Sequence, residues 1–268
     1  MKTHDLLSTK NLMAGYEKKT ILNGIDLIIP SHKISVIIGA NACGKSTLLK
    51  TLARLIRPER GEVYLDQNNI SNLASKQFAR ILGLLPQSPI VPDGITVQDL
   101  VARGRYPHQS FFQGLSNKDF EAVAEALDLM GISELADRSV DTLSGGQRQR
   151  VWIAMALAQQ TDFLLLDEPT TYLDITYQIE ILDLLTDLNQ KKGTTIVMVL
   201  HDINLSARYA DYIFAVHQGN LVAQGKPSEI INEELIEKVF HLDCSVIQDP
   251  VSQTPLIVPK GRHHVKGA

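Results

Sequence analysis

Apolar residues in this chain fall into short continuous runs, which alternate with segments that have helical spacing. Four runs have the length and composition of fully buried strands. They are Lys33–Ile38, Ile81–Gln87, Phe163–Asp167 and Thr194–Leu200. Between the last two, Gln178–Lys191 has the spacing of an amphipathic helix. Because a strand, helix, strand order needs a crossover connection, the pattern predicts a parallel sheet with right-handed crossovers.

Other patterns flank these runs. Segments such as Leu22–Pro30 alternate apolar and polar residues, which predicts short antiparallel strands before the first buried strand. A turn at Arg57–Gly61 precedes another short strand, Glu62–Asp66. From about residue 95 to 158 the spacing is helical. The helices predicted there are Val97–Arg103, Lys118–Met130 and Gln147–Gln160. Beyond them we expect one more helix, Glu233–Phe240, and an extended tail that carries prolines.

The first buried strand leads into a glycine-bearing loop and then into an apolar-periodic helix. The loop has the pattern G-x-x-x-x-G-K-S and contains Gly39, Ala40, Asn41, Ala42, Cys43, Gly44, Lys45, Ser46 and Thr47. Backbone N–H groups of such a loop and of the following helix can surround a polyphosphate. Lys45 would reach the β- and γ-phosphates, and the hydroxyl of Ser46 would bind Mg²⁺. The sequence therefore predicts a nucleotide-binding protein.

These patterns together predict an α/β fold. We expect a P-loop NTPase core with a parallel sheet, an N-terminal antiparallel β subdomain and an inserted α-helical subdomain. A chain of 268 residues can form one substantial domain. Within that single domain, 1–268, residues 1–87 and 159–228 would form the RecA-like core with the β subdomain. Residues 88–158 would form the helical subdomain, and residues 229–268 the C-terminal helix and tail.

Polar residues follow three of the predicted strands. Asp167 and Glu168 come at the end of one, Gln87 ends another, and His201 follows a third. In a parallel sheet these ends lie beside the phosphate loop, so Asp167 can bind Mg²⁺. Glu168 can orient and deprotonate a water for attack on the γ-phosphate. Gln87 and His201 can face the same phosphate, so Glu168, His201, Gln87 and Lys45 are the catalytic candidates.

Two further features belong to the candidate site. Ser144, Gly145, Gly146 and Gln147 stand just ahead of a long helix, where they can form a second anion site. Taken alone, this segment would more simply be a helix cap made by Ser144. Tyr16 lies before the first strands and can stack on adenine, an interaction of about 1–3 kcal/mol per base. The competing interpretation is that Tyr16 is a half-buried aromatic residue of a strand.

Composition narrows the remaining function classes. The net charge is −4 and charged residues make up 21 % of the chain, so no basic excess indicates nucleic acid as a partner. The N-terminus leads into no apolar signal core, and no stretch approaches the ~18 apolar residues that span a bilayer. Cys43 and Cys244 lie far apart in the sequence. We interpret them as free thiols in a reducing cytoplasm rather than as a disulfide.

This set of features resembles the ATP-binding cassette (ABC) ATPases over nearly the whole chain. The similar segments are Gly39–Thr47 (Walker A), Gln87 (Q-loop), Leu143–Gln147 (signature), Phe163–Glu168 (Walker B), Tyr172–Asp174 (D-loop) and His201 (switch histidine). Several longer segments resemble, more specifically, the ATPase subunits of bacterial ferric-siderophore importers. The segments that carry this resemblance are Gly104–Gln109, Ser144–Gln159, Asp167–Ile175, Asp249–Val251 and Thr254–Leu256.

The resemblance implies a mechanism and partners. Two subunits would form a head-to-tail homodimer, with each ATP held between the phosphate loop of one copy and Ser144–Gln147 of the other. Asp174 would contact the opposite subunit, and Gln87 would join Ser46 and Asp167 around Mg²⁺. Closing and opening of the dimer would drive membrane permease subunits near Gln87, and indirectly serve a substrate-binding protein. The ATPase would then be peripheral to the cytoplasmic face of the inner membrane.

Other functions stay open at this point. A soluble ABC ATPase acting on ribosomes or DNA usually has two cassettes or a long coiled coil between the phosphate loop and the signature. Here Lys45 and Ser144 are only 99 residues apart, with no heptad run. An exporter cassette would often be fused to membrane helices. Among importers, haem and cobalamin systems are the near alternatives, because the cassette never touches the cargo and reveals it only by kinship.

Three expectations concern individual residues. The family's common loop has Pro and Gly where this chain has Ala40 and Ala42, and alanine accepts a positive φ poorly. We therefore expect right-handed backbone angles at Ala42. Cys43 lies beside a helix N-terminus and near Lys45, a setting that lowers a thiol pKa. Its reactive thiolate would then be a point of attack for thiol reagents.

A mixed basic and aromatic stretch follows Gln87 in the helical region. It runs through Arg103–His108 to Phe111 and Phe112. Aromatic and arginine side chains of this kind suit an interface, so we expect Arg105 and these phenylalanines to contact the permease. The alternative is that Phe111 and Phe112 pack inside the helical insertion.

Overall fold

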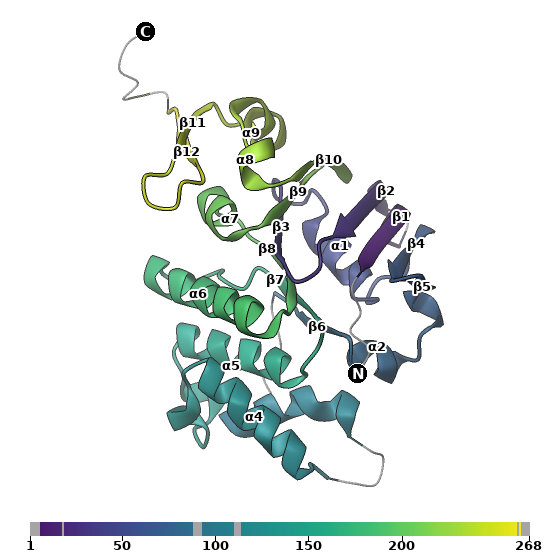
Figure 1. The fold of residues 1–268 in the computed structure, drawn as a ribbon, viewed down its shortest axis with the longest axis vertical. Coiled ribbons are helices and arrows are strands. Elements are labelled where there is room, and N and C mark those ends of the chain that lie inside the picture. The colour runs from purple at the N-terminus through teal and green to yellow at the C-terminus, as the bar shows by residue number, and fades with distance from the viewer. Residues whose placement is uncertain (1–5, 18, 88–92, 110–113, 262, 264–268) are drawn as a thin grey trace.

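A six-stranded sheet lies at the centre of the fold (Figure 1). The structure is a computed structural model, and it describes residues 6–17, 19–87, 93–109, 114–261 and 263. In spatial order the strands are β10 (Asn220–Gly225), β9 (Tyr212–His217), β3 (Ile34–Ile38), β8 (Thr195–Val199), β7 (Phe163–Asp167) and β6 (Leu82–Leu85). Neighbours are parallel except for β10, which pairs antiparallel with β9. The predicted parallel sheet is confirmed, whereas sequence analysis did not identify β9 and β10.

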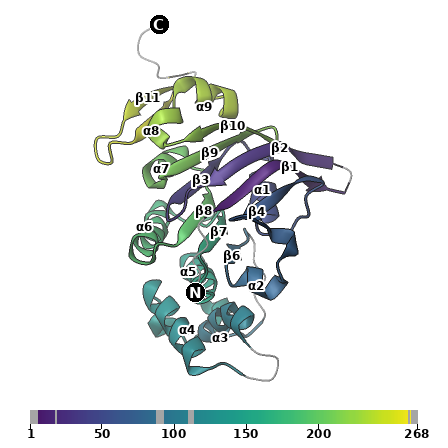
Figure 2. The same ribbon diagram turned by 45° about the vertical axis from the view of Figure 1, so that its right-hand side comes forward.

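A smaller antiparallel sheet lies on one side of the central sheet, as Figures 1 and 2 both show. Its strands, in spatial order, are β2 (Lys19–Ile29), β1 (Leu7–Tyr16), β4 (Arg60–Leu65) and β5 (Asn68–Asn69). Helix α1 (Lys45–Leu52) contacts β1 and β2 of this sheet and β7 of the central one. The phosphate loop, which precedes α1, is therefore held where the two sheets meet. The predicted antiparallel layer ahead of that loop is confirmed.

The central strands are buried on both faces, and successive residues alternate between two cores. In β3, Val36 and Ile38 belong to a core shared with the helices, whereas Ile37 belongs to the core around α1. In β8, Met198 and Val199 divide in the same way. Burial on both faces explains why these strands read as continuous apolar runs instead of alternating ones.

Helices cover the other face of the central sheet and one end of the molecule. At that end, the lower part of Figure 1, α3 (Val97–Ala102), α4 (Asn117–Leu129) and α5 (Gly145–Ala158) pack on one another. Helices α6 (Ile175–Lys192), α7 (Ile203–Tyr209) and α9 (Glu233–Phe240) contact β8, β3 and β9 respectively. The shorter elements are α2 (Ser75–Ala79), α8 (Pro227–Ile230) and the 3-10 turns η1 (Ile70–Asn72), η2 (Arg103–His108), η3 (Ser133–Leu135) and η4 (Val140–Thr142). Over the described part of the chain, every helix is too short or too polar to cross a membrane.

The tail, which the sequence predicts to be simply extended, forms a β-hairpin. Strands β11 (Cys244–Gln248) and β12 (Pro255–Pro259) pair antiparallel as a separate two-stranded sheet. Pro255 and Pro259 stand at the two ends of β12. Proline is tolerated at the ends of an edge strand because its missing N–H is not needed for pairing there. Pro255 and Pro259 therefore mark the ends of β12, a strand that the sequence analysis did not predict to be paired.

The prediction that Arg105 lies on an exposed partner surface is wrong. The residue is only 5 % exposed, and its Nε donates to Oδ1 of Asp119 at 2.8 Å. Nη1 donates to the backbone oxygen of Ala158 at 2.7 Å. Arg105 thus joins η2 to α4 and α5 from the inside, whereas the next residue, Tyr106, is 72 % exposed. Phe111 and Phe112 lie outside the described residues.

Candidate functional site

Four neighbouring strands bring the predicted site residues to one edge of the central sheet. The phosphate loop follows β3, His201 follows β8, Asp167 ends β7, and Gln87 follows β6. Since β3, β8, β7 and β6 are adjacent and parallel, their carboxyl ends lie side by side. This is the edge at which open α/β sheets bind ligands. The topology therefore places residues from four separate parts of the sequence within reach of one another.

The phosphate loop approaches the backbone of β9 closely. A Cβ atom at Gly39 would lie 2.3 Å from the backbone oxygen of Val216, so only glycine fits there. Gly44 caps α1 with a φ of 112°, which glycine adopts without strain. Lys45 is 5 % exposed, and its Nζ donates to the carbonyl oxygens of Gly39 and Ala40 at 2.8 and 2.9 Å. The ammonium group is thereby held over the loop.

Ala42 has a left-handed backbone, so the expectation of right-handed angles is wrong. Its φ is 61°. A left-handed conformation costs an L-residue roughly 1–2 kcal/mol relative to the right-handed one. The residue lies in the turn between β3 and α1. The alanine therefore carries strain in the loop that a glycine would not.

Asp167 and Ser46 form a polar pair beneath the loop. Asp167 is 1 % exposed, and Ser46 Oγ donates to its Oδ1 at 2.9 Å. Burial raises the pKa of Asp167, while the hydrogen bond from Ser46 opposes that rise. Its Oδ2 is buried, with no hydrogen-bond partner among the described residues. A carboxylate and a hydroxyl are hard oxygen ligands, so this pair fits Mg²⁺, which needs only one or two protein ligands.

Glu168 is held by three side chains. His201 Nε2 lies 2.7 Å from its Oε1, and Oε2 accepts from Gln87 Nε2 at 2.5 Å. Thr171 Oγ1 donates to the same Oε2 at 3.0 Å. The backbone of Glu168 is left-handed, with a φ of 57°. Gln87, Glu168 and His201 are thus brought together as a cluster, and Thr171 joins them although sequence analysis did not select it.

A pocket of about 250 Å³ opens beside the loop. Its lining residues are Tyr16, Ile21, Asn41, Ala42, Gly44, Lys45, Ser46, Thr47 and Glu168. Tyr16, at the end of β1, is 49 % exposed, so its ring is available at the wall of this pocket. The pocket therefore joins the predicted adenine-stacking residue to the phosphate loop and to the carboxylate of Glu168.

The prediction of a lowered thiol pKa at Cys43 is wrong. The side chain is 6 % exposed, and burial raises its pKa. The positive charge of Lys45 acts in the predicted direction, but it is the smaller effect. Cys43 and Cys244 are both buried free thiols, in agreement with the expectation from their spacing.

Ser144–Gln147 does not line the pocket beside the phosphate loop. Ser144 Oγ accepts from the backbone N–H of Gln147, and Gln147 Oε1 accepts from that of Ser144, which makes a capping box for α5. Gly146 packs against the ring of Tyr177. Asp174 caps α6 by accepting from the N–H of Tyr177 at 3.1 Å. In one copy of the chain, these predicted nucleotide contacts and the phosphate loop form two separate groups.

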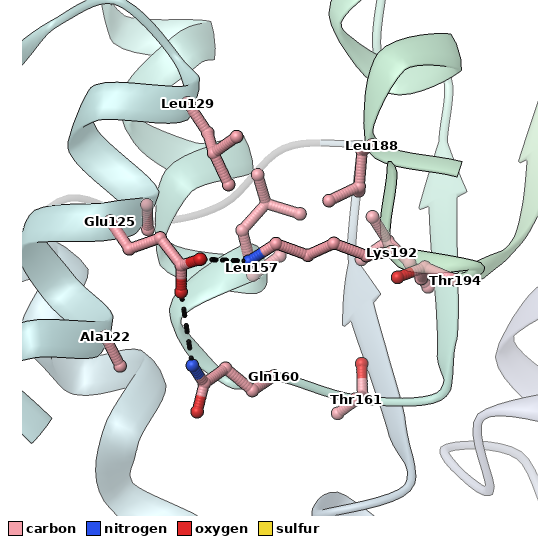
Figure 3. A pocket seen from close by; sticks show the side chains of 12 residues that line it. Ala122, Glu125, Leu129, Leu157, Gln160, Thr161, Leu188, Lys192 and Thr194 are labelled. Carbon is pink, nitrogen blue, oxygen red and sulfur yellow. Dashed lines mark hydrogen bonds and ion pairs between the residues drawn. The ribbon is translucent and has the colours of Figure 1, made fainter. Parts of the chain in front are cut away.

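A second pocket, of about 230 Å³, lies between α4, α5 and the end of α6 (Figure 3). Leucines such as Leu129, Leu157 and Leu188 line it. Among the lining residues, Lys192 Nζ lies 2.5 Å from Oε1 of Glu125. No predicted site residue in the described part of the chain contributes to its lining. This pocket is therefore distinct from the candidate site.

Comparison with known proteins identifies the family. The family model described as ABC transporter matches residues 22–171, which is more than half of the chain. The chain belongs to the ABC transporter family. It is therefore an ATP-binding cassette and an ATPase, and the P-loop core predicted from the sequence is that of this family.

Curated relatives and a solved structure are similar over nearly the whole cassette. The ferric enterobactin transport ATP-binding protein FepC of Escherichia coli is 54 % identical, over 96 % of this chain and 94 % of its own. The achromobactin transport ATP-binding protein CbrD of Dickeya dadantii is 52 % identical, over 96 % of this chain and 95 % of its own. A structure titled as an inward-facing, metal-chelate type ABC transporter has a chain with TM-score 0.83 and 31 % identity, covering 96 % of this chain and 98 % of that one.

Proposed function

We propose that this cassette hydrolyses ATP to power an importer of iron(III)–siderophore complexes. The observation that carries the catalytic part is Glu168, held between Gln87 and His201 beside Asp167 and the phosphate loop. The relatives that match nearly the whole chain at 52–54 % identity support the transport part, because their names specify ferric enterobactin and achromobactin transport.

Glu168 acts as the general base in this proposal. Its carboxylate accepts the proton of the attacking water, while Gln87 and His201 hold its two oxygens in place. Lys45 leaves the carbonyl oxygens of its loop for the β- and γ-phosphates, and Tyr16 stacks on adenine. Ser46, Asp167 and Gln87 are the proposed Mg²⁺ ligands. When bound, Mg²⁺ neutralises the negative charge that develops on the phosphate oxygens.

A second copy of the chain completes each ATP site in the proposal. Ser144–Gln147 presents the N-terminal N–H groups of α5, an arrangement that favours an anion, but lies outside the pocket at the phosphate loop. A head-to-tail homodimer would bring this segment to the γ-phosphate of the other copy, and Asp174 to the opposite subunit. Hydrolysis would then wait for closure, because one copy lacks part of the donors.

The proposed partners follow from the importer function. The cassette would act with membrane permease subunits and, through them, with a substrate-binding protein, at the cytoplasmic face of the membrane. Residues 88–158 would be the helical subdomain through which the permease is moved. Residues 1–87 and 159–228 would form the core with its β subdomain, and residues 229–268 the C-terminal part.

The catalytic proposal is tested with Glu168→Gln. This variant keeps the shape of the side chain but replaces the carboxylate with a neutral amide that cannot take up a proton, so turnover should fall by about 10²–10⁴-fold. Binding of a fluorescent ATP analogue should remain. The matched control is Glu234→Gln, an exposed glutamate of α9, which should hydrolyse ATP at the wild-type rate. Turnover of Glu168→Gln within a few-fold of wild type would contradict the role of Glu168.

Cargo is tested separately, by uptake into cells that lack the chromosomal gene. Cells carrying wild-type protein should accumulate radioactive iron from ferric siderophores, and cells carrying Glu168→Gln should not. Uptake of haem and of cobalamin, measured in the same cells, decides between the importer classes. Restored haem or cobalamin uptake, without ferric-siderophore uptake, would refute the proposed siderophore cargo and leave the ATPase proposal intact.

A further inference from the structure

The C-terminal hairpin is attached to α7, the short helix that follows His201. Asn204 Nδ2 donates to the backbone oxygen of Ile257 at 3.2 Å, and the N–H of Ile257 donates to Asn204 Oδ1 at 2.7 Å. The side-chain amide therefore pairs with β12 in the way that a neighbouring strand would. Other residues of α7 and β12 are in contact as well. The first turn of α7 is thereby fixed against the hairpin.

A second attachment lies one helical turn further along α7. Arg208 Nη2 lies 2.5 Å from Oδ2 of Asp249, which is only 5 % exposed. Oδ1 of Asp249 accepts the backbone N–H groups of Val251 and Ser252 at 2.8 and 3.3 Å, which orders the turn of the hairpin. The hydrogen bond from Arg208 lowers the pKa of Asp249. The hairpin turn and the last turn of α7 are thus one hydrogen-bonded unit.

Helix α7 packs on β3, and its two attachments to the hairpin add to that support. It has seven residues, and isolated helices shorter than about 12 residues are marginal in water. Asn204 and Arg208 are four residues apart, so both attachments lie on one face of the helix. Together they fix its rotation and its position along its axis. Figure 1 shows α7 between the central sheet and the C-terminal elements.

The helix in turn controls His201. Asp202 caps α7 by accepting the N–H of Leu205 at 2.9 Å, so the residue that follows His201 is part of the helix start. His201 Nε2 lies 2.7 Å from Glu168 Oε1, and a shift of α7 by about 1 Å would break this hydrogen bond. A displacement of this size can cost about 10²-fold in rate.

We propose that the hairpin Cys244–Pro259 positions His201 for catalysis, with Asn204 and Arg208 as the positioning residues. The inference rests on the proposed function, in which His201 acts on the γ-phosphate beside Glu168. The hairpin does not touch the nucleotide. It sets the place of α7, and α7 sets the place of the imidazole ring.

The first test compares Asn204→Ala and Arg208→Ala with a matched control. Lys260→Ala removes an exposed ion pair with Asp243 at the open end of the same hairpin, away from α7. For the two α7 variants we expect kcat to fall by roughly tenfold and the KM for ATP to stay within about twofold. Lys260→Ala should match wild type, and Arg208→Lys, which keeps the charge, should recover most of the loss. Equal losses in all variants would refute the proposal.

The second test separates positioning from general stability. In a His201→Gln background, Asn204→Ala should lower the residual kcat by less than about twofold, because the residue that it positions is already gone. The same tenfold loss in both backgrounds would mean that the hairpin acts elsewhere.

A third measurement does not depend on activity. In protein with ¹⁵N-labelled histidine, the Nε2 signal of His201 should shift in Asn204→Ala and Arg208→Ala, and not in Lys260→Ala. An unchanged signal in both α7 variants would overturn the positioning role even if their turnover fell. Failure of Glu168→Gln to lose turnover would remove the proposed function, but it would leave this signal as a separate result.

Discussion

Replacing Arg105 by alanine should destabilise the helical region strongly. The guanidinium is buried and makes hydrogen bonds to the carboxylate of Asp119, the backbone oxygen of Ala158 and the side chain of Gln160. The side chains of Arg105 and Asp119 are 6 % and 7 % exposed. Arg105→Ala would therefore leave a carboxylate buried without its counter-charge, and water could not easily reach it.

The size of the effect follows from this burial. Removing one partner of a buried ion pair typically costs about 3–5 kcal/mol, a large part of an ordinary unfolding free energy of about 5–15 kcal/mol. For a chain of this length, each kcal/mol lowers the melting temperature by about 2–3 °C, so the expected loss is about 6–15 °C. The double variant Arg105→Met with Asp119→Leu should recover most of it, because no charge then remains buried.

Thermal denaturation followed by circular dichroism measures the effect. The control is Lys192→Ala, which breaks the ion pair between Lys192, at the end of α6, and Glu125 of α4, the helix that also carries Asp119 (Figure 3). Those side chains are 36 % and 48 % exposed. Solvent screens such pairs, so the control should change the unfolding free energy by less than about 1 kcal/mol. A loss of less than about 1 kcal/mol for Arg105→Ala would refute the reasoning.

The pH dependence gives an independent check. Burial alone would raise the pKa of Asp119, but hydrogen bonds from Ser116 and Arg105 outweigh it and lower the pKa to about 2. A lowered folded-state pKa stabilises the protein above the ordinary pKa of about 4, and this contribution is lost as the pH falls towards about 2. The shift corresponds to about 2 kcal/mol. The stability difference between wild type and Arg105→Ala should therefore narrow on acidification, and a constant difference would contradict this account.

Three further predictions concern the site. Ala42→Gly should raise the melting temperature by a few degrees, because glycine removes roughly 1 kcal/mol of left-handed strain, whereas Ala40→Gly, outside the left-handed region, should not. In a Cys244→Ser background, alkylation of Cys43 at neutral pH should be at least about tenfold slower than that of a free thiol, since burial raises its pKa; rapid labelling would contradict this. Thr171→Val should lower kcat by about 3–10-fold through loss of one hydrogen bond to Glu168, without a change in ATP binding; an unchanged kcat would mean that this bond is unimportant.

The central strands could be predicted because a strand that is buried on both faces appears in the sequence as a continuous apolar run. Strand β7 occupies Phe163–Asp167 and α9 occupies Glu233–Phe240, with the predicted bounds. Helix α6 begins at Ile175, three residues before the prediction, because the Asp174 side chain caps it. Strands β9 and β10 were not predicted, although Tyr212–His217 is a short apolar run. The hairpin of the tail was missed because its two short segments, β11 and β12, were not predicted to pair with each other.

Residue types at strand ends gave the candidate site, but not its internal contacts. Gln87, Glu168 and His201 were each selected for their place after a strand. Their hydrogen bonds to one another exist because β6, β7 and β8 are neighbours in the sheet. Thr171 carried no signal, since threonine three residues after a strand is ordinary. The left-handed turn at Glu168 brings the hydroxyl of Thr171 back to the carboxylate of Glu168.

The failed predictions at Cys43 and Arg105 have one physical cause. At Cys43 the sequence shows the nearby charge of Lys45, and that charge does lower the thiol pKa. The sequence cannot show the desolvation of the thiol, which comes from packing against distant segments. Burial is the larger effect, so the pKa of Cys43 is raised. At Arg105 the polar sequence context suggested a surface, whereas Asp119 and Ala158 enclose the side chain. Local sequence identifies which charges are present, but contacts between distant segments decide whether water still surrounds them.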